Sequence, residues 1–349
     1  MRLLHPDDKL LYTHGYLLGG YDMDQHRRSS LCILSFVFLS IGLASPGFSE
    51  NFPTRPVTII VPSSPGNGPD VIIRMVSAQL AERWGQQIVI INRPGAGGLI
   101  GAQAAIKAEP GGYTLYMPIT SSLVILPVTQ TLPFDLNRSF VPIGLVAEQP
   151  MVIGVAPSLG VSTLSEFIAL AKAKPNSILY GATTRGSLPH LTTEYFCSRA
   201  GIELTFVPYS TGGTPKEIID VMGGRLSMLV EALPPLRGAI EAGSLKALAV
   251  ATPSRLPNYR SLPTVAETIP GFRASGWSVL VAPAGTPDDV IRKINVDLRE
   301  VLQSPEMKRQ FEQQGTLANP LSPAETGEFI RSEQNLWRPV LKQVGFEPQ

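Results

Sequence analysis

Short runs of β-branched residues alternate with amphipathic stretches from residue 55 onward in this 349-residue chain. Residues 57–61 read Val-Thr-Ile-Ile-Val, apolar residues at helical spacing follow up to Trp84, and a second extended run occupies 87–91. Glycine, proline, serine or threonine turns join these segments. Such alternation is typical of βαβ units, in which helices connect and cover parallel strands. The pattern predicts an α/β fold.

The alternation continues toward the C-terminus. Further segments are expected as a helix at 99–108 and as strands at 113–117, twice within 141–155, at 245–250 and at 277–282. Thr163 and Thr214 are predicted N-caps, because a glutamate stands three residues after each hydroxyl, and Pro215 suits a first helical position. The last helices are expected to open at 286–289 and 322–325, and to pack back onto the first lobe.

The size and charge of the chain indicate two lobes and a small partner. A chain of this length with 44% hydrophobic and 16% charged residues buries a sizeable core. The predicted division places 50–150 and 273–349 in lobe one and 151–272 in lobe two. Net charge is +1, with 29 basic and 28 acidic residues, so the chain has no electrostatic signature of nucleic-acid or anionic-membrane binding.

The N-terminal segment has the pattern of a secretory signal. Basic residues at 26–28 precede an apolar run at 31–43, and small residues follow before Glu50. The run is too short to span a bilayer. We expect residues 1–49 to be a signal peptide, with Met23 as the true start, and the mature protein to be soluble, periplasmic and monomeric.

Removal of that segment leaves few residues for metal or thiol chemistry. Of two cysteines and four histidines, only Cys197 and His190 lie beyond residue 49. The sequence therefore predicts no disulfide, no metal site and no cofactor. Cys197 lies in the apolar run Tyr-Phe-Cys and is expected to be a buried packing thiol.

Three loops share one design, in which a strand ends, small residues follow and a helix begins. They occupy 64–70, 183–190 and 209–215. A helix N-terminus offers unpaired N–H groups and partial positive charge, and glycine lets an anion approach the backbone. Ligands of open α/β sheets lie beyond the carboxyl ends of the strands, where these loops fall. Each loop is either a carboxylate cradle or simply a capped turn; together they favour a ligand held between two lobes.

Glycine-rich and nucleophile motifs argue against nucleotide binding and against a catalytic triad. Residues 93–98 are glycine-rich but miss the G-x-G-x-x-G spacing, and neither a P-loop nor G-x-S-x-G occurs. His190 is read as a helix-cap or packing residue, with ligand contact as the alternative. Arg185 is either solvated or a bidentate partner of a carboxylate. Tyr209 and Trp277 are expected to be shared between core and cleft wall.

Several motifs together resemble one known family. They are P-x-x-P-G-x-G-x-D at 62–70, N-R-P-G-A-G-G at 92–98, G-G-Y-T-L at 111–115, V-P-Y at 207–209, L-P-T-V-A-E at 262–267 and W-x-x-L-x-A-P-A-G-T-P at 277–287. In this order they are similar to the Bug family, the extracytoplasmic solute receptors of tripartite tricarboxylate transporters. The resemblance covers about residues 52–345.

The resemblance implies a two-lobed, type II periplasmic binding-protein fold with a cleft between lobes. It implies a non-enzymatic receptor for a small carboxylate, such as a di- or tricarboxylate, an acidic amino acid or an aromatic acid, with membrane permease subunits as partners. It points to ligand contacts at Ser64, Gly66, Asn67, Thr120, Ser121, Ser122, Thr184, Arg185, Ser187, His190, Tyr209 and Gly212.

Two departures from the family pattern bear on the ligand. Residues 184–186 read Thr-Arg-Gly where the family often has Gly-Asn-Gly, and Glu231 stands near a position where the family often has aspartate. The added charge of Arg185 suggests a ligand with at least two acidic groups. Two other functions stay open: a periplasmic sensor subunit that presents its solute to a signalling receptor, and a hydrolase or lyase using Asp70, Glu231 or His190.

Overall fold

The computed structural model describes residues 52–209 and 213–346. The predicted signal peptide at 1–49 and the proposed start at Met23 lie outside the described residues. No helix within the described ranges combines the length and apolarity needed to cross a membrane.

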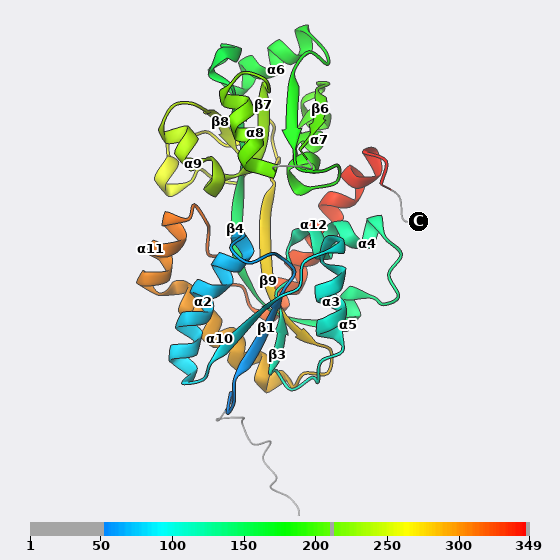
Figure 1. Cartoon of the computed structure of the whole chain (residues 1–349), viewed down its shortest axis with the longest axis vertical. Helices are drawn as coiled ribbons and strands as arrows, with labels where there is room; N and C mark the ends of the chain where they lie inside the picture. Colours follow the sequence, from blue (N-terminus) through cyan, green and yellow to red (C-terminus); the bar gives the residue numbers. More distant parts are fainter. Residues whose placement is uncertain (1–51, 210–212, 347–349) are drawn as a thin grey trace, which may run out of the picture. The chain divides into compact units, whose positions relative to one another are not determined.

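The described residues form a nine-stranded sheet with two parallel ends joined by antiparallel strands. The strands are β1 Val57–Val61, β2 Ile88–Asn92, β3 Thr114–Tyr116, β4 Phe140–Val155, β5 Leu179–Ala182, β6 Thr205–Pro208, β7 Met228–Ala232, β8 Lys246–Val250 and β9 Ser275–Pro283. Their order is β2-β1-β3-β9-β4-β7-β5-β6, and β8 also pairs with β4. The sets β2-β1-β3 and β7-β5-β6 are each parallel. Figure 1 shows these two sets at opposite ends of the molecule, one in each lobe.

Strand β4 belongs to both lobes. Its first part, from Phe140 to Pro150, pairs with β9, whereas Met151–Val155 pair with β7 and β8. The sequence predicted two extended runs here, and the structure makes them one strand of 16 residues. A single strand forms because both runs are apolar and both find partners in the ladder. The chain thus has the predicted α/β, two-lobed binding-protein fold.

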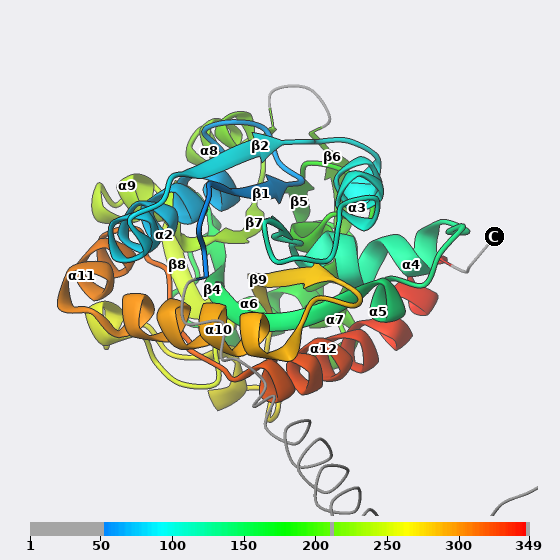
Figure 2. The same cartoon turned by 90° about the horizontal axis from the view of Figure 1, so that it is seen from below.

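Helices cover the sheet. They are α2 Gly68–Trp84, α3 Leu99–Ile106, α4 Leu126–Thr129, α5 Leu136–Ser139, α6 Leu164–Ala173, α7 Leu188–Ala200, α8 Gly213–Met222, α9 Leu233–Glu241, α10 Asp288–Gln303, α11 Pro305–Gln313 and α12 Pro323–Gln343. The C-terminal helices return to lobe one as expected: α10 packs on α2 and β4, and α12 packs on β4 (Figure 2). Buried apolar residues of α2 and α10 share one core with β1, β3 and β9.

Most predicted helix starts are confirmed, and one is wrong. Thr163 caps α6 by accepting the N–H of Glu166, and Ser322 forms a capping box with Glu325. Helix α8, however, already includes Gly213, so Thr214 is not its N-cap. The Thr214 hydroxyl instead donates to Glu231 Oε2 at 2.9 Å. The half-buried carboxylate of Glu231, on a neighbouring strand, has outcompeted the local capping pattern.

Candidate ligand-binding site

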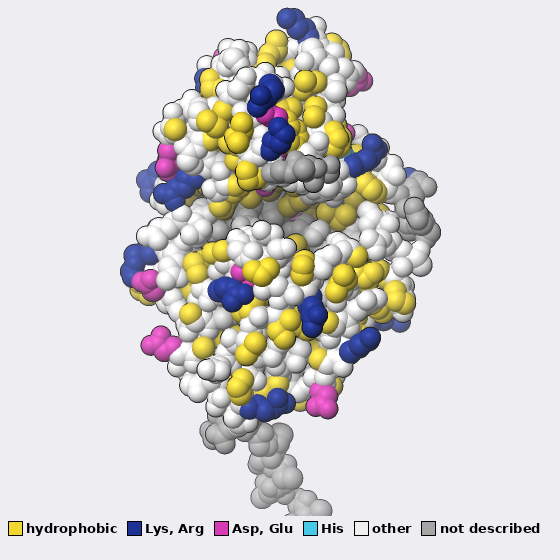
Figure 3. Space-filling view, viewed as in Figure 1, with side chains coloured by type: hydrophobic (Ala, Val, Ile, Leu, Met, Phe, Trp, Pro, Cys, Tyr) yellow, Lys and Arg dark blue, Asp and Glu magenta, His cyan; other side chains and the backbone are white. Residues whose placement is uncertain are grey.

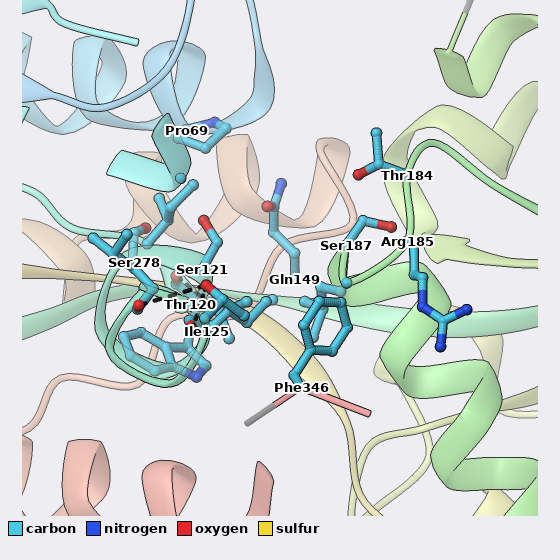
Figure 4. Close-up of a pocket in the computed structure, with 18 residues that line it drawn as sticks. Pro69, Thr120, Ser121, Ile125, Gln149, Thr184, Arg185, Ser187, Ser278 and Phe346 are labelled. Atoms are coloured by element: carbon cyan, nitrogen blue, oxygen red, sulfur yellow. Dashed lines mark hydrogen bonds between the residues drawn. The ribbon is translucent and has the colours of Figure 1, made fainter. Parts of the chain in front are cut away.

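A cavity of about 460 Å³ lies where the loops of both lobes meet (Figures 3 and 4). Its walls come from the start of α2, the segment after β3, the middle of β4 and β9, the loop before α7 and the end of the chain. The lining residues are Pro69, Gly97, Ile119–Ser121, Ile125, Leu126, Thr129, Gln149, Thr184–Leu188, Gly276–Ser278 and Phe346. None of these described lining residues is acidic, and several carry hydroxyls.

The loop before α2 is held in shape by the buried carboxylate of Asp70. Its Oδ2 accepts the Gly66 N–H and the Arg74 Nε–H, each at 2.9 Å, and its Oδ1 accepts the Asn92 amide at 2.9 Å. Gly66 has φ +81°, a conformation that favours glycine. These bonds, led by that of Arg74, lower the pKa of Asp70 to about 2. The loop is therefore fixed by an ionised carboxylate at neutral pH.

This loop presents Pro69 to the cavity. The predicted contacts Ser64, Gly66 and Asn67 lie on the exposed part of the same loop, outside the cavity lining. Asn67 is the N-cap of α2, but its side chain makes no capping bond. The predicted first-lobe loop therefore reaches the cavity through Pro69, near its end, and not through its glycine-rich centre.

The segment after β3 brings two of its three predicted hydroxyl residues to the cavity. Thr120 is buried, and its Oγ1 accepts the Trp277 N–H at 2.9 Å, which ties the segment to β9. Ser121 lines the cavity and begins a π-helical turn at Ser121–Ile125. Ser122 is fully buried outside the lining, and a Cβ at Gly98 would come within 2.2 Å of its Oγ. Gly98 therefore has to be glycine for this turn to close.

The loop before α7 supplies the second-lobe wall. Ser187 caps the helix, and Thr184, Ser187 and Leu188 line the cavity. His190 lies beneath this loop: it is 3% exposed, its Nδ1 accepts the Gly186 N–H at 3.4 Å, and its ring meets Phe206 edge-on at 4.6 Å. Burial, assisted by the charge of Arg185, lowers the pKa of His190. The imidazole is a neutral capping and packing group.

Arg185 belongs to the cavity lining, but its guanidinium is engaged elsewhere. Its Nη2 donates to the Val344 carbonyl at 2.8 Å. Figure 4 shows the side chain pointing away from Ser121 and Gln149. Tyr209 is also outside the lining, with its hydroxyl donating to Asp220 Oδ2 at 2.7 Å, and Gly212 lies outside the described residues.

Comparison with known proteins decides the class of this site. The model of the tripartite tricarboxylate transporter family receptor matches residues 72–346. This chain belongs to that receptor family. Members of the family are periplasmic solute-binding receptors rather than enzymes.

Its relatives match over nearly their whole length. BugT of Bordetella pertussis is 33% identical over 318 residues, which cover 90% of this chain and 97% of BugT. The structure of R. palustris Rpa4515 with adipate has a TM-score of 0.74 and 31% identity, and covers 85% of this chain and 100% of its own. MatC from Rhodopseudomonas palustris with bound malate has a TM-score of 0.69 and 25% identity, over 83% of this chain and 100% of its own.

Sequence reasoning missed several residues of the receptor cavity, of which three bear most on ligand binding. Gln149 and Ser278 are polar residues within apolar strands, a signal that could have marked them. Neither side chain has a hydrogen-bond partner in the described part of the chain, so both are available to a ligand. Phe346 lies at the end of the chain, far in sequence from every predicted loop, and nothing in its neighbourhood predicts that it returns to the cavity.

The residues considered for hydrolysis do not form a catalytic group. Asp70 is fully paired, His190 bonds the backbone of its own loop, and Glu231 accepts the Thr214 hydroxyl and the Ala232 N–H. The described residues contain no cluster of histidine, cysteine and acidic groups able to hold a metal ion. Cys197 is buried, as predicted, and burial raises the pKa of its thiol.

Proposed function

We propose that this receptor captures a small carboxylate in the periplasm and delivers it unchanged to membrane permease subunits. The observation that carries the proposal is the cavity between the lobes, whose described lining offers hydroxyls, an amide and no acidic side chain. An anion entering it meets hydrogen-bond donors and no like charge. Relatives in the same family were solved with adipate and with malate, which are carboxylates.

Direct contacts are assigned to side chains that reach the cavity without an internal partner. The side chains of Ser121, Gln149, Thr184 and Ser278 have no hydrogen-bond partner in the described part of the chain, and all four residues line the cavity. Ser187 adds a fifth polar group, although its hydroxyl also accepts the His190 N–H at the start of α7. The remaining predicted residues of the two loops, Ser64, Gly66, Asn67 and His190 among them, act by shaping the walls.

The proposal includes the organisation of the chain. Residues 50–150 with 273–349 form lobe one and 151–272 form lobe two, a division that agrees with the change of partner along β4. The chain is exported by the signal at 1–49, acts as a monomer and catalyses no reaction. Family membership favours the transport receptor over the sensor subunit.

Ligand-induced stabilisation tests the function. The melting temperature of the purified protein is measured with mono-, di- and tricarboxylates, acidic amino acids and, as the neutral control, their amides. A ligand at a hundred times its Kd adds about 2.7 kcal/mol, a shift of several degrees. Ser121→Ala should reduce the shift, whereas Ser198→Ala on the exposed face of α7 should not. Amides acting as well as acids would overturn the proposal.

A further inference from the structure

The cavity is polar on one side and apolar on the other. Ser121 and Gln149 bring their polar ends to the same space in Figure 4, Ser187 turns its hydroxyl toward Arg185, and Ile125 and Phe346 lie below Ser121 and Gln149. Leu126, Leu188 and Trp277 also line the cavity. Trp277 is 3% exposed, with its indole N–H bonded to buried Glu333, so its ring is fixed in place. A ligand that fills this space needs an apolar body as well as a charged end.

Phe346 is held at the apolar side by the end of α12. Its backbone N–H donates to the Leu341 carbonyl at 2.9 Å, and Leu341 is fully buried. Its ring packs on Gly186, where an added Cβ would come within 2.8 Å of Cζ. The Arg185 guanidinium donates to the Val344 carbonyl. The loop before α7 therefore contacts the C-terminal segment twice, through Arg185 at Val344 and through Gly186 at the Phe346 ring. The C-terminal segment 344–346 is therefore a built wall of the cavity.

Among the described lining residues, no cation faces the polar groups across the cavity. Arg185 is the sole charged residue among the described lining residues, and its guanidinium is turned to Val344. A second acidic group on the ligand would lose water at the apolar side without gaining a partner there. An unpaired buried charge is costly, whereas an apolar group in the same place gains from contact with Phe346.

We propose that the receptor selects a carboxylate with a single acidic group on an apolar body, such as an aromatic ring or a short alkyl chain. Phe346 is the specificity-determining wall for that body, and Arg185 is a positioning residue that holds the C-terminal segment. This inference rests on the proposed carboxylate function. The sequence suggested that Arg185 binds a second acidic group of the ligand; in the structure the partner of Arg185 is instead the Val344 carbonyl.

Matched acid pairs test the ligand class by isothermal calorimetry on the intact protein. The pairs are benzoate with benzene-1,4-dicarboxylate, and hexanoate with adipate, the ligand of a solved relative. The monoacid of each pair should bind at least about tenfold more tightly, because a single unpaired charge in an apolar site costs more than 1.4 kcal/mol. Tighter binding of either diacid overturns the inference and leaves the carboxylate function standing. Binding of no acid in the panel overturns the function itself.

Four variants separate the roles of the residues. Phe346→Ala should weaken the binding of benzoate about tenfold and that of acetate hardly at all. Phe346→Leu should restore most of the lost benzoate affinity. Ser121→Ala should weaken every acid by a similar factor. Arg185→Gln should weaken benzoate binding by a smaller factor than Phe346→Ala. It should leave the preference for the monoacid over the diacid unchanged. Loss of diacid binding alone in Arg185→Gln, or unchanged benzoate affinity in Phe346→Ala, would show that the assignment is wrong.

Discussion

Helices α2 and α8, one in each lobe, both bury a carboxylate near their start, and they do so in opposite ways. Asp70 is 2% exposed and accepts hydrogen bonds from Gly66, Arg74 and Asn92. Glu217 is fully buried, and neither of its oxygens has a partner in the described part of the chain. The first carboxylate is ionised and ordered by donors. The surroundings of the second disfavour its ionised form.

The pKa values follow from these environments. Hydrogen bonds, that from Arg74 first, lower the pKa of Asp70 to about 2. Burial, and then the nearby charge of Glu231, raise the pKa of Glu217 to about 7. The difference teaches that burial alone does not decide the charge of a carboxylate; the donors supplied by neighbouring segments do. Lobe one thus has a loop fixed over the whole neutral range, and lobe two carries a group that titrates near neutrality.

The largest expected effect is at Asp70. Asp70→Asn should lower the free energy of unfolding at pH 7 by about 2 kcal/mol, measured by urea denaturation, because the charge-assisted bonds are weakened. The half-exposed Arg74 keeps the loss from being larger. Since the native pKa is depressed, this stability is complete above about pH 4 and is lost as pH falls toward 2. A difference from wild type that stays constant from pH 5 to pH 2 would contradict the mechanism.

Glu217→Gln should raise the free energy of unfolding, and by a smaller amount than Asp70→Asn lowers it. A raised native pKa means that stability is complete below the unfolded pKa of about 4.5 and falls as pH rises through 7. The variant should therefore be more stable than wild type by about 1–2 kcal/mol at pH 8, with little difference at pH 5, since the buried amide also lacks a partner. Thermal unfolding of the variant and the wild type at pH 5 and pH 8 measures this stability difference. Exposed Glu328→Gln is the matched control, and an equal gain there would argue against burial as the cause.

Asn92→Ala should give the smallest effect. The Asn92 amide donates to Asp70 Oδ1 and to the Ser63 carbonyl, each at 2.9 Å, and so ties the end of β2 to the loop. Its loss should cost about 1 kcal/mol and raise the pKa of Asp70, since one donor to the charged form is gone. Acid unfolding should begin at higher pH than in wild type. In an Asp70→Asn background the substitution should cost less, because the two residues act through one bond.

Local patterns in the sequence determined the α/β class, most element positions and two of the loops that line the cavity. The run 57–61 becomes β1 residue for residue, and the caps at Thr163 and Ser322 form as expected. Hydrophobic periodicity and capping act between residues a few positions apart, so the sequence carries them directly. The family motifs, which are also local, led to the receptor family that the comparisons show.

Contacts between distant segments were decided by the tertiary structure. Glu231 draws the Thr214 hydroxyl away from its capping position, Val344 takes the guanidinium of Arg185, and Phe346 reaches the cavity from the end of the chain. Each depends on where another strand or helix comes to lie, and no local spacing records that. The sequence by itself indicated that loops of two lobes would meet around a cavity; only the packed chain decided which side chains face that cavity, because a side chain bonds to the nearest partner in space.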